Sequence, residues 1–210
     1  IIEQSSPIGC AEPRREGRGA VFPGGKATPY RSAIQSNRTS DMLAIIGGTG
    51  LDALADLQDA RTQAVDTPYG APVPVIHHGG LAGHDVLFLA RHGDTHGIPP
   101  HRINYRANIR ALQSLGATEV IAVAAVGGIR GHPPGSLALP DQLIDYTSGR
   151  AATFFDGGDT PVTHVDFTRP YTPALRDACR VAASRAGIAA HDGGVYAAVN
   201  GPRLETAAEI

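Results

Sequence analysis

The sequence predicts an α/β fold in a single domain. Apolar segments of strand length alternate with segments whose apolar residues repeat at helical spacing. Two of the apolar segments each run directly into a pair of glycines: residues 43–46 precede Gly47 and Gly48, and residues 120–126 precede Gly127 and Gly128. Because ligands of α/β sheets bind beyond the carboxyl ends of the strands, we expect the functional site at these glycine turns. A length of 210 residues also suits one domain.

The first strand, at 43–47, leads into a glycine turn in which Thr49 supplies a hydroxyl. Hydrophobic period and turn residues then predict, in order, a helix at 51–57, a strand at 63–66, a turn at 67–70, strands at 73–77 and 85–90, and a helix at 103–115. The strand at 85–90 stops at Arg91, so charge is expected at its carboxyl end.

The second half of the chain repeats the opening design, since a continuous apolar strand precedes Gly127 and Gly128. The same signals predict a strand at 120–126, strands at 142–147 and 162–167, a helix from Thr172-Pro173 to Gly187, and a last strand at 194–199. Cys179 falls on the apolar face of that helix, and we expect it to pack in the core.

The two ends of the chain differ from its middle. Met42 is the only methionine, and residues 1–41 have neither helical nor strand periodicity. We therefore expect 1–41 to be a disordered leader outside the fold and 42–210 to be the domain. Residues 206–210 resemble the first turn of a helix with nothing to end it, so we expect the domain to be truncated at its C-terminus.

Composition excludes several classes of partner. The net charge is -2, so no basic face is expected for nucleic acid. Cys10 and Cys179 are too few and too far apart for a disulfide framework or a zinc knuckle. No apolar run reaches the length of about 18 residues that a membrane helix needs. We expect a soluble, cytoplasmic protein that binds a small molecule and neither nucleic acid nor membrane.

The glycine turn at 47–50 is typical of a phosphate site, because its backbone N–H groups can face an anion. A helix starting after it would add positive charge. Three ligands compete: a dinucleotide, with Asp66 as the ribose-binding acid, a nucleoside triphosphate, and free phosphate; a plain tight turn is the fourth reading. The triphosphate is excluded, since a triphosphate loop needs a lysine and the only lysine is Lys26.

Arg91 and His92 form a second candidate anion site, because arginine presents a planar fork to phosphate oxygens and histidine can donate another hydrogen bond. The alternative is an arginine paired with a surface carboxylate. His92, His96 and His101 with Asp94 also suggest a metal, but their glycine-rich and proline-rich surroundings do not match zinc spacings. We therefore expect no metal.

Glu205 in the segment 201–205 is the third candidate. A carboxylate held by a Gly-Pro turn at a strand end can accept a hydrogen bond from a ligand N–H. It can equally be an acid at the start of a helix. The residues alone leave the two readings open.

Taken together, these segments resemble the purine nucleoside phosphorylase and methylthioadenosine phosphorylase family, and most closely its bacterial S-methyl-5'-thioinosine phosphorylase branch. The resemblance covers 42–210. It is carried by IIGGTG at 45–50, TPYG at 67–70, FLARHG at 88–93, PHRINYRAN at 100–108, AVGGI at 125–129, IDYT at 144–147, HVDF at 164–167 and GPRLET at 201–206.

The resemblance implies a mixed central β-sheet flanked by helices and a pentosyltransferase of purine salvage. In this family inorganic phosphate attacks the anomeric carbon of a nucleoside as the purine leaves, so phosphate is a co-substrate and no other cofactor is expected. The phosphate ligands implied here are Thr49, Arg91 and His92, with the backbone of Ala124 and Ala125. Relatives often carry threonine or asparagine at the position of Ala124, so one side-chain contact is absent here.

The resemblance also implies the base. A glutamate at the position of Glu205 accepts the ring N–H of a 6-oxopurine, and Leu204 matches the thioinosine branch. His164 matches a histidine that covers the 5'-methylthio group of a neighbouring subunit, which implies a homotrimer. The expected reaction converts S-methyl-5'-thioinosine and phosphate to hypoxanthine and 5-methylthioribose 1-phosphate.

The sequence leaves the substrate and the functional class open. Inosine, guanosine and methylthioadenosine are alternative substrates. The chain ends before the family's later ribose and base contacts, so we assign no catalytic residue and expect these 210 residues alone to be inactive. The rival classes are a dinucleotide-binding oxidoreductase built on Gly48 to Gly50 with Asp66, and a nucleoside-binding protein without catalysis.

Overall fold

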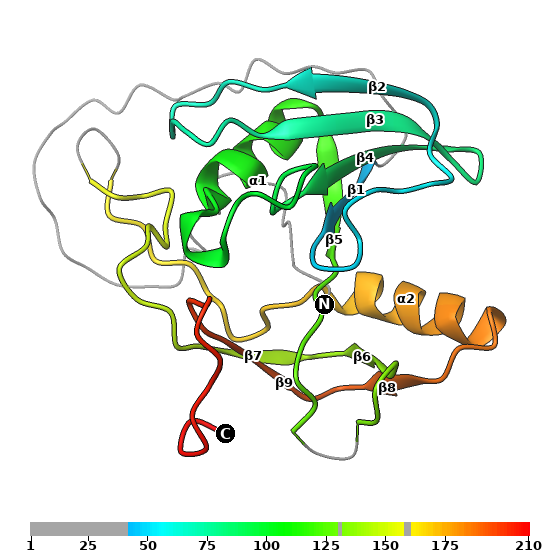
Figure 1. Cartoon of the computed structure of the whole chain (residues 1–210), viewed down its shortest axis with the longest axis vertical. Coiled ribbons are helices and arrows are strands. Elements are labelled where there is room, and N and C mark those ends of the chain that lie inside the picture. Colours follow the sequence, from blue (N-terminus) through cyan, green and yellow to red (C-terminus); the bar gives the residue numbers. More distant parts are fainter. Residues whose placement is uncertain (1–41, 130–131, 158–160) are drawn as a thin grey trace, which may run out of the picture.

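The structure is a computed structural model that describes residues 42–129, 132–157 and 161–210. The predicted leader at 1–41 lies outside the described residues. Figure 1 shows two layers of structure: a larger sheet with one helix, and below it a narrow ribbon of strands with a second helix. The expected α/β class with a mixed sheet and flanking helices is confirmed.

The larger sheet has five strands in the order β2-β3-β4-β1-β5. They are β1 (Met42–Gly47), β2 (Gln58–Ala64), β3 (Val75–Leu81), β4 (His84–Ala90) and β5 (Ala117–Ala122). The central strand β1 is parallel to both β4 and β5, whereas β3 is antiparallel to β4 and β2 to β3. The carboxyl ends of β1, β4 and β5 therefore lie side by side.

Burial explains why β1 and β4 occupy the centre. The last five residues of β4 are all buried, and alternate residues of β1 are buried in the main core. β2 is polar and exposed along its whole length, as suits an edge strand. The main core comprises Met42, Ala44, Ile46, Ile76, Leu87, Leu89, Ala111, Leu112 and Val120.

Helix α1 (Tyr105–Ser114) follows the short 3-10 helix η1 (Pro100–Arg102) and packs against β5. The side chain of Asn104 caps α1, since its Oδ1 accepts the N–H of Ala107 at 3.0 Å. Its Nδ2 reaches back to the carbonyls of residues 69–71 at 2.8 to 3.2 Å. One side chain therefore begins the helix and fixes the turn at 67–70.

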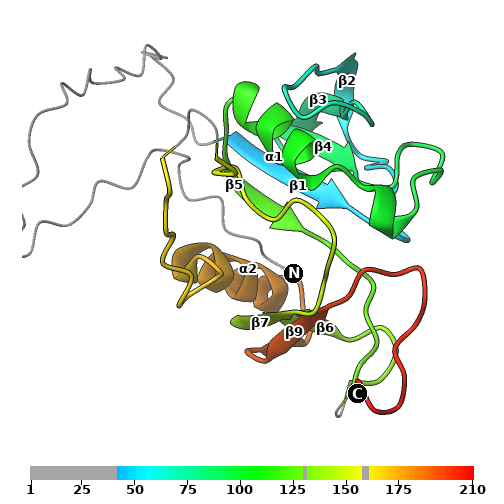
Figure 2. The ribbon, with the colours of Figure 1, turned by 90° about the vertical axis from the view of Figure 1, so that its left-hand side faces the viewer.

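The ribbon consists of two parallel pairs, β6 with β8 and β7 with β9. Their bounds are β6 (Leu137–Leu139), β7 (Gln142–Asp145), β8 (Ala190–Asp192) and β9 (Val195–Ala198), and helix α2 (Pro173–Arg185) packs on β6 and β8. Figure 2 shows this layer beside the carboxyl end of β5. Cys179 packs on the small core of Leu139, Tyr171 and Leu175, as predicted, and burial raises the pKa of its thiol.

The predicted helix at 51–57 is wrong, because these residues form bends and turns. Gly47 at the end of β1 lies at the opposite edge of the sheet from Gln58, which pairs with Gly80. The connection must recross the sheet, and a helix of seven residues would advance only about 10 Å. An extended chain of the same length reaches about twice as far.

Other bounds also differ from expectation. The segment 162–167 pairs with no strand in the described part of the chain, and residues 206–209 form a turn rather than a helix. β5 ends at Ala122, four residues before the predicted end, and β2 lies earlier than 63–66. β6 and β8 were not predicted, since three residues carry no readable alternation. No helix in the described ranges is long and apolar enough to cross a membrane.

Candidate active site

The first part of the site is the edge where β1, β4 and β5 end. Arg91 continues β4 and donates its backbone N–H to the carbonyl of Gly47 at 3.1 Å. Val123 continues β5 and donates to the carbonyl of Ile46 at 2.9 Å. The residues after these three ends are the five expected phosphate ligands, Thr49, Arg91, His92, Ala124 and Ala125. The structure places their three segments next to one another.

Arg91 spans this edge. Its Nη1 donates to the carbonyl of Val123 at 2.6 Å, which fastens the guanidinium to the end of β5. The guanidinium also lies directly on Gly48, because a Cβ added there would be 2.0 Å from Nη2. The structure does not support the alternative of an arginine paired with a surface carboxylate, since no described carboxylate pairs with this guanidinium and its hydrogen bond goes to a carbonyl. Its remaining N–H groups can serve an anion.

His92 is buried, with 6% of its surface exposed. Its Nδ1 lies 2.8 Å from the carbonyl oxygen of Ile98. A carbonyl can only accept, so Nδ1 carries the proton of this hydrogen bond. Nε2 is then the ring nitrogen left for a ligand. A neutral ring could accept a hydrogen bond at Nε2 from a ligand, and a charged ring could donate one.

The backbone adds further donors. The N–H of Leu51 donates to the carbonyl of Gly48 at 2.7 Å and closes a turn at 48–51, in which Thr49 is exposed at the tip. Among the described residues, the N–H groups of Ala124 and Ala125 donate to no backbone carbonyl. No helix follows the turn, so the helix dipole expected there is absent from this site. The N–H groups and Arg91 are donors that could face an anion.

The loop that carries Arg91 and His92 is held by two histidine–aspartate pairs. His77 of β3 donates from Nε2 to Asp94 at 2.9 Å, and His96 donates from Nδ1 to Asp52 at 2.9 Å. The rings of His92 and His96 stack with centroids 4.6 Å apart. Within the ranges described, no three His, Cys, Asp or Glu side chains are placed to hold a metal ion.

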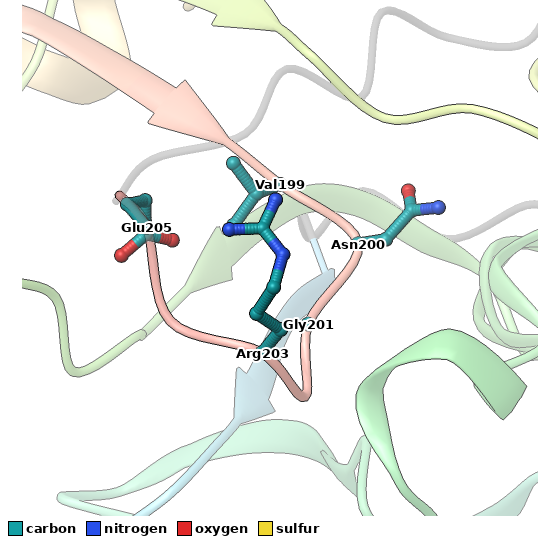
Figure 3. A pocket seen from close by; sticks show the side chains of 5 residues that line it. All are labelled: Val199, Asn200, Gly201, Arg203 and Glu205. Carbon is teal, nitrogen blue, oxygen red and sulfur yellow. The ribbon is translucent and has the colours of Figure 1, made fainter. Parts of the chain in front are cut away.

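The second part of the site is the segment after β9. A small pocket there is lined by Val199, Asn200, Gly201, Arg203 and Glu205. Figure 3 shows the Arg203 side chain turned back toward Val199, with Glu205 on one side and Asn200 on the other. Asn200 exchanges two hydrogen bonds with the backbone of Ser148, at 2.8 and 3.0 Å, which hold the start of this segment.

The segment is fixed at its far end by a forked ion pair. Both terminal nitrogens of Arg203 donate to Glu209 at 2.8 Å. The hydrogen bond from Arg203, together with one from the backbone N–H of Thr206, lowers the pKa of Glu209 to about 2. Glu205 remains outside this fork and lines the pocket. In this chain residues 206–209 form a turn, so the structure shows no helix for which Glu205 would be the starting acid.

The two parts of the site meet at a proline. Gly201 lies against Pro100, since a Cβ added to Gly201 would be 3.1 Å from the Cβ of Pro100. Pro100 begins η1, directly after the loop that carries Arg91 and His92. Leu204 is 82% exposed in this segment. His164 is also exposed, in the segment 161–169.

The dinucleotide reading does not fit the topology. A ribose-binding acid must follow the strand beside the glycine turn, and the strand neighbours of β1 are β4 and β5. Asp66 follows β2, which is three strands away at the edge of the sheet. The helix that should begin at the turn is also missing. The match of Gly48, Gly50 and Asp66 to that fingerprint is therefore coincidental.

Comparison with known families decides the class. Residues 42–210 match the family described as the phosphorylase superfamily. The chain belongs to the phosphorylase superfamily. As a member, it is an enzyme of the nucleoside phosphorylase type, that is, a pentosyltransferase. The resemblance on which the sequence prediction rested is confirmed.

Two relatives with different named activities are similar to this chain. A probable S-methyl-5'-thioinosine phosphorylase of Xanthomonas campestris pv. campestris is 55% identical over 169 residues, which cover 80% of this chain and 68% of that protein. A probable 6-oxopurine nucleoside phosphorylase of Moorella thermoacetica is 47% identical over 169 residues, covering 80% of this chain and 64% of that protein.

Solved phosphorylase structures share the fold. Methylthioadenosine phosphorylase from Schistosoma mansoni in complex with adenine superposes with a TM-score of 0.75 at 29% identity, over 81% of this chain and 69% of that chain. A methylthioadenosine phosphorylase sourced from an antarctic soil metagenomic library gives 0.73 at 39% identity, over 82% and 61% of the two chains.

The sequence did not reveal the tertiary contacts of four residues that shape this candidate site. Gly48 seats the Arg91 guanidinium, Asn104 joins α1 to the turn at 67–70, and the pair of Asp52 and His96 joins two loops. His96 was considered only as a metal ligand. Nothing local could have revealed its partner, because Asp52 is 44 residues away in the sequence.

Proposed function

We propose that the protein catalyses the phosphorolysis of a 6-oxopurine methylthionucleoside in purine salvage. S-methyl-5'-thioinosine and inorganic phosphate would give hypoxanthine and 5-methylthioribose 1-phosphate. The observation that carries the proposal is the convergence of Thr49, Arg91 and His92 at one sheet edge, with Glu205 in the adjoining segment. Phosphate is then a co-substrate, and no further cofactor is needed.

In the proposed reaction a phosphate oxygen forms a bond to the anomeric carbon while the bond from that carbon to the purine nitrogen breaks. The electron pair of the broken bond stays on the purine, which leaves with a proton. Positive charge develops on the sugar, so an anion held beside it stabilises the transition state. Arg91, His92 and the N–H groups of Ala124 and Ala125 would hold that anion, and its fixed position supplies much of the rate enhancement.

Base selection would depend on Glu205. Its carboxylate can accept the ring N–H that a 6-oxopurine carries beside its carbonyl, whereas adenine has no proton on that nitrogen. Leu204 would pack on the base, and its 82% exposure leaves it available. A relative named a probable 6-oxopurine nucleoside phosphorylase, at 47% identity, supports this choice of base.

The proposed recognition of the 5'-methylthio group requires a second subunit. His164 would cover this group in a neighbouring subunit of a homotrimer. The apolar residues around it support an interface, since Val162, Val165 and Phe167 are 87%, 64% and 57% exposed in the single chain. A relative at 55% identity is named a probable S-methyl-5'-thioinosine phosphorylase, which supports S-methyl-5'-thioinosine as the substrate. We also propose that the enzyme acts in the cytoplasm.

The proposal is tested by incubating the full-length protein with S-methyl-5'-thioinosine, inosine or S-methyl-5'-thioadenosine, each with and without phosphate. Released base is separated by chromatography. We expect phosphate-dependent release of hypoxanthine, with the highest kcat/KM for S-methyl-5'-thioinosine. Preferred release of adenine would overturn the choice of base. Binding of nucleoside with no release at all would instead favour a non-catalytic nucleoside-binding protein.

A further inference from the structure

We infer that Asp52 and His96 are a positioning pair that locks the two phosphate-binding loops of this enzyme into one unit. The inference rests on the proposed function, because it assumes that Thr49, Arg91 and His92 hold the phosphate. Asp52 lies three residues after Thr49, and His96 lies four residues after His92. Their hydrogen bond of 2.9 Å is therefore a direct link between the glycine turn and the arginine loop.

The second contact of His96 carries the link to a phosphate ligand. Its ring stacks on the ring of His92, with centroids 4.6 Å apart and planes inclined by 29°. His92 is also held from another side, where Nδ1 donates to Ile98 at 2.8 Å. The imidazole of His92 is thus fixed by a hydrogen bond and a ring face, and the second of these depends on His96.

The backbone of His96 shows that its side chain is kept at a cost. His96 has φ of 54°, in the left-handed region that non-glycine residues rarely adopt. A glycine at this position would adopt the same backbone conformation without strain. Backbone strain often occurs at functional sites. The two contacts of the His96 ring, to Asp52 and to His92, therefore indicate a role for this side chain at the proposed phosphate site.

Stability alone does not explain the pair. The side chains of His96 and Asp52 are 43% and 37% exposed, and exposed ion pairs contribute little to the free energy of unfolding. Removing the pair should therefore leave the fold intact and loosen the relative position of Thr49, Arg91 and His92. Because phosphate bridges both loops, the Michaelis constant for phosphate is the quantity that should respond.

The same loop supplies a matched control. His77 and Asp94 form a second pair at the same distance of 2.9 Å, with side-chain exposures of 23% and 46%. That pair fastens the loop to β3, which carries none of the proposed phosphate ligands. A merely structural role for these pairs would give the two of them similar effects, whereas a positioning role singles out Asp52 and His96.

The experiment is a double-mutant cycle with Asp52→Ala, His96→Gly and the double variant in the full-length enzyme. We expect each single change to raise the KM for phosphate about tenfold, and the double variant to be no worse than either single one. The KM for nucleoside should change less than about twofold, because that ligand does not bridge the loops. Asp52→Asn should recover part of the loss, since its amide oxygen still accepts from Nδ1.

Two further measurements keep the inference falsifiable. The melting temperature of His96→Gly should equal or exceed that of the parent, because glycine removes the backbone strain. The cycle of His77→Ala and Asp94→Ala should shift the KM for phosphate less than about twofold. Additive effects of Asp52 and His96, or equal effects of the two pairs, would overturn the inference.

Failure of the proposed function is a separate outcome. It would appear as a parent enzyme without phosphate-dependent release of base, or as an Arg91→Ala variant with an unchanged KM for phosphate. A parent that turns over and an Arg91 variant that responds, combined with no coupling between Asp52 and His96, would reject the positioning pair alone.

Discussion

At the scale of single residues, Arg91 is the side chain on which the proposed phosphate site depends most. Its position between Gly48 and the carbonyl of Val123 leaves guanidinium N–H groups for an anion. Arg91→Ala should raise the KM for phosphate by on the order of 100-fold, with a smaller effect on the KM for nucleoside. Steady-state kinetics with each substrate varied in turn measures both constants, and an unchanged phosphate constant would contradict the assignment.

Gly48 is a residue whose missing side chain matters. A Cβ at this position would lie 2.0 to 2.1 Å from three atoms of the Arg91 guanidinium, which is a flexible side-chain end that can move aside. Gly48→Ala should therefore fold normally and raise the KM for phosphate about tenfold.

Gly127→Ala is the matched control, because a Cβ there meets nothing within 4 Å. Thermal melting and phosphate kinetics of the two variants are compared. Equal phosphate constants in the two variants would show that Gly48 does not seat Arg91.

Glu209 gives a prediction about pH. Its pKa of about 2 lies below the ordinary value of 4.5, because Arg203 and the N–H of Thr206 donate to the carboxylate. The forked pair therefore stabilises the turn at 203–209 above about pH 4.5, and this stabilisation is lost as the pH falls toward 2. Carboxyl-carbon NMR should give a midpoint near 2 for Glu209, and Arg203→Ala should raise this midpoint toward the ordinary value, with the N–H of Thr206 still holding it below that value. Identical midpoints would exclude the fork in solution.

At the scale of elements, α1 is begun by a side chain that also holds a distant turn. Asn104→Ala removes the cap on Ala107 and three contacts to the carbonyls of residues 69–71. The free energy of unfolding should fall by roughly 1–3 kcal/mol. Urea unfolding followed by circular dichroism measures it.

Asn108→Ala, one turn later in the same helix, is the control. Among the described residues no hydrogen bond of the Asn108 side chain is recorded, so this change should cost less than about 0.5 kcal/mol. If Asn108→Ala lowered the free energy of unfolding as much as Asn104→Ala does, the effect of Asn104→Ala could not be assigned to the loss of the cap.

At the scale of the whole molecule, the exposed apolar segment around His164 predicts assembly. Val165 and Phe167 are 64% and 57% exposed, and such residues are expected to be covered. The full-length protein should sediment as a trimer, and Val165→Asp should shift it toward monomer. Ile188→Asp, at 52% exposure in the connection from α2 to β8, should leave the trimer intact. A monomeric parent would contradict the proposed homotrimer.

Much of the fold could be predicted from local pattern. The buried strands β1 and β4 and the helices α1 and α2 were readable, because continuous apolar runs and helical spacing are properties of neighbouring residues. The helix at 51–57 and the strand at 162–167 were misread. The first must cross the sheet and the second has no partner strand in the described ranges, and neither condition is visible locally.

The α/β class and the strand ends that carry chemistry could be predicted from the sequence, and its resemblance to a known family supplied Thr49, Arg91, His92 and Glu205 as the proposed ligands. The position of β1 between β4 and β5 is visible only in the folded chain, and it excludes the dinucleotide reading of Asp66. The tertiary structure also revealed that Asp52 meets His96 and that Gly48 lies under Arg91. The physical reason is that strand order and loop contacts arise from packing between residues far apart in the chain, which no local periodicity encodes.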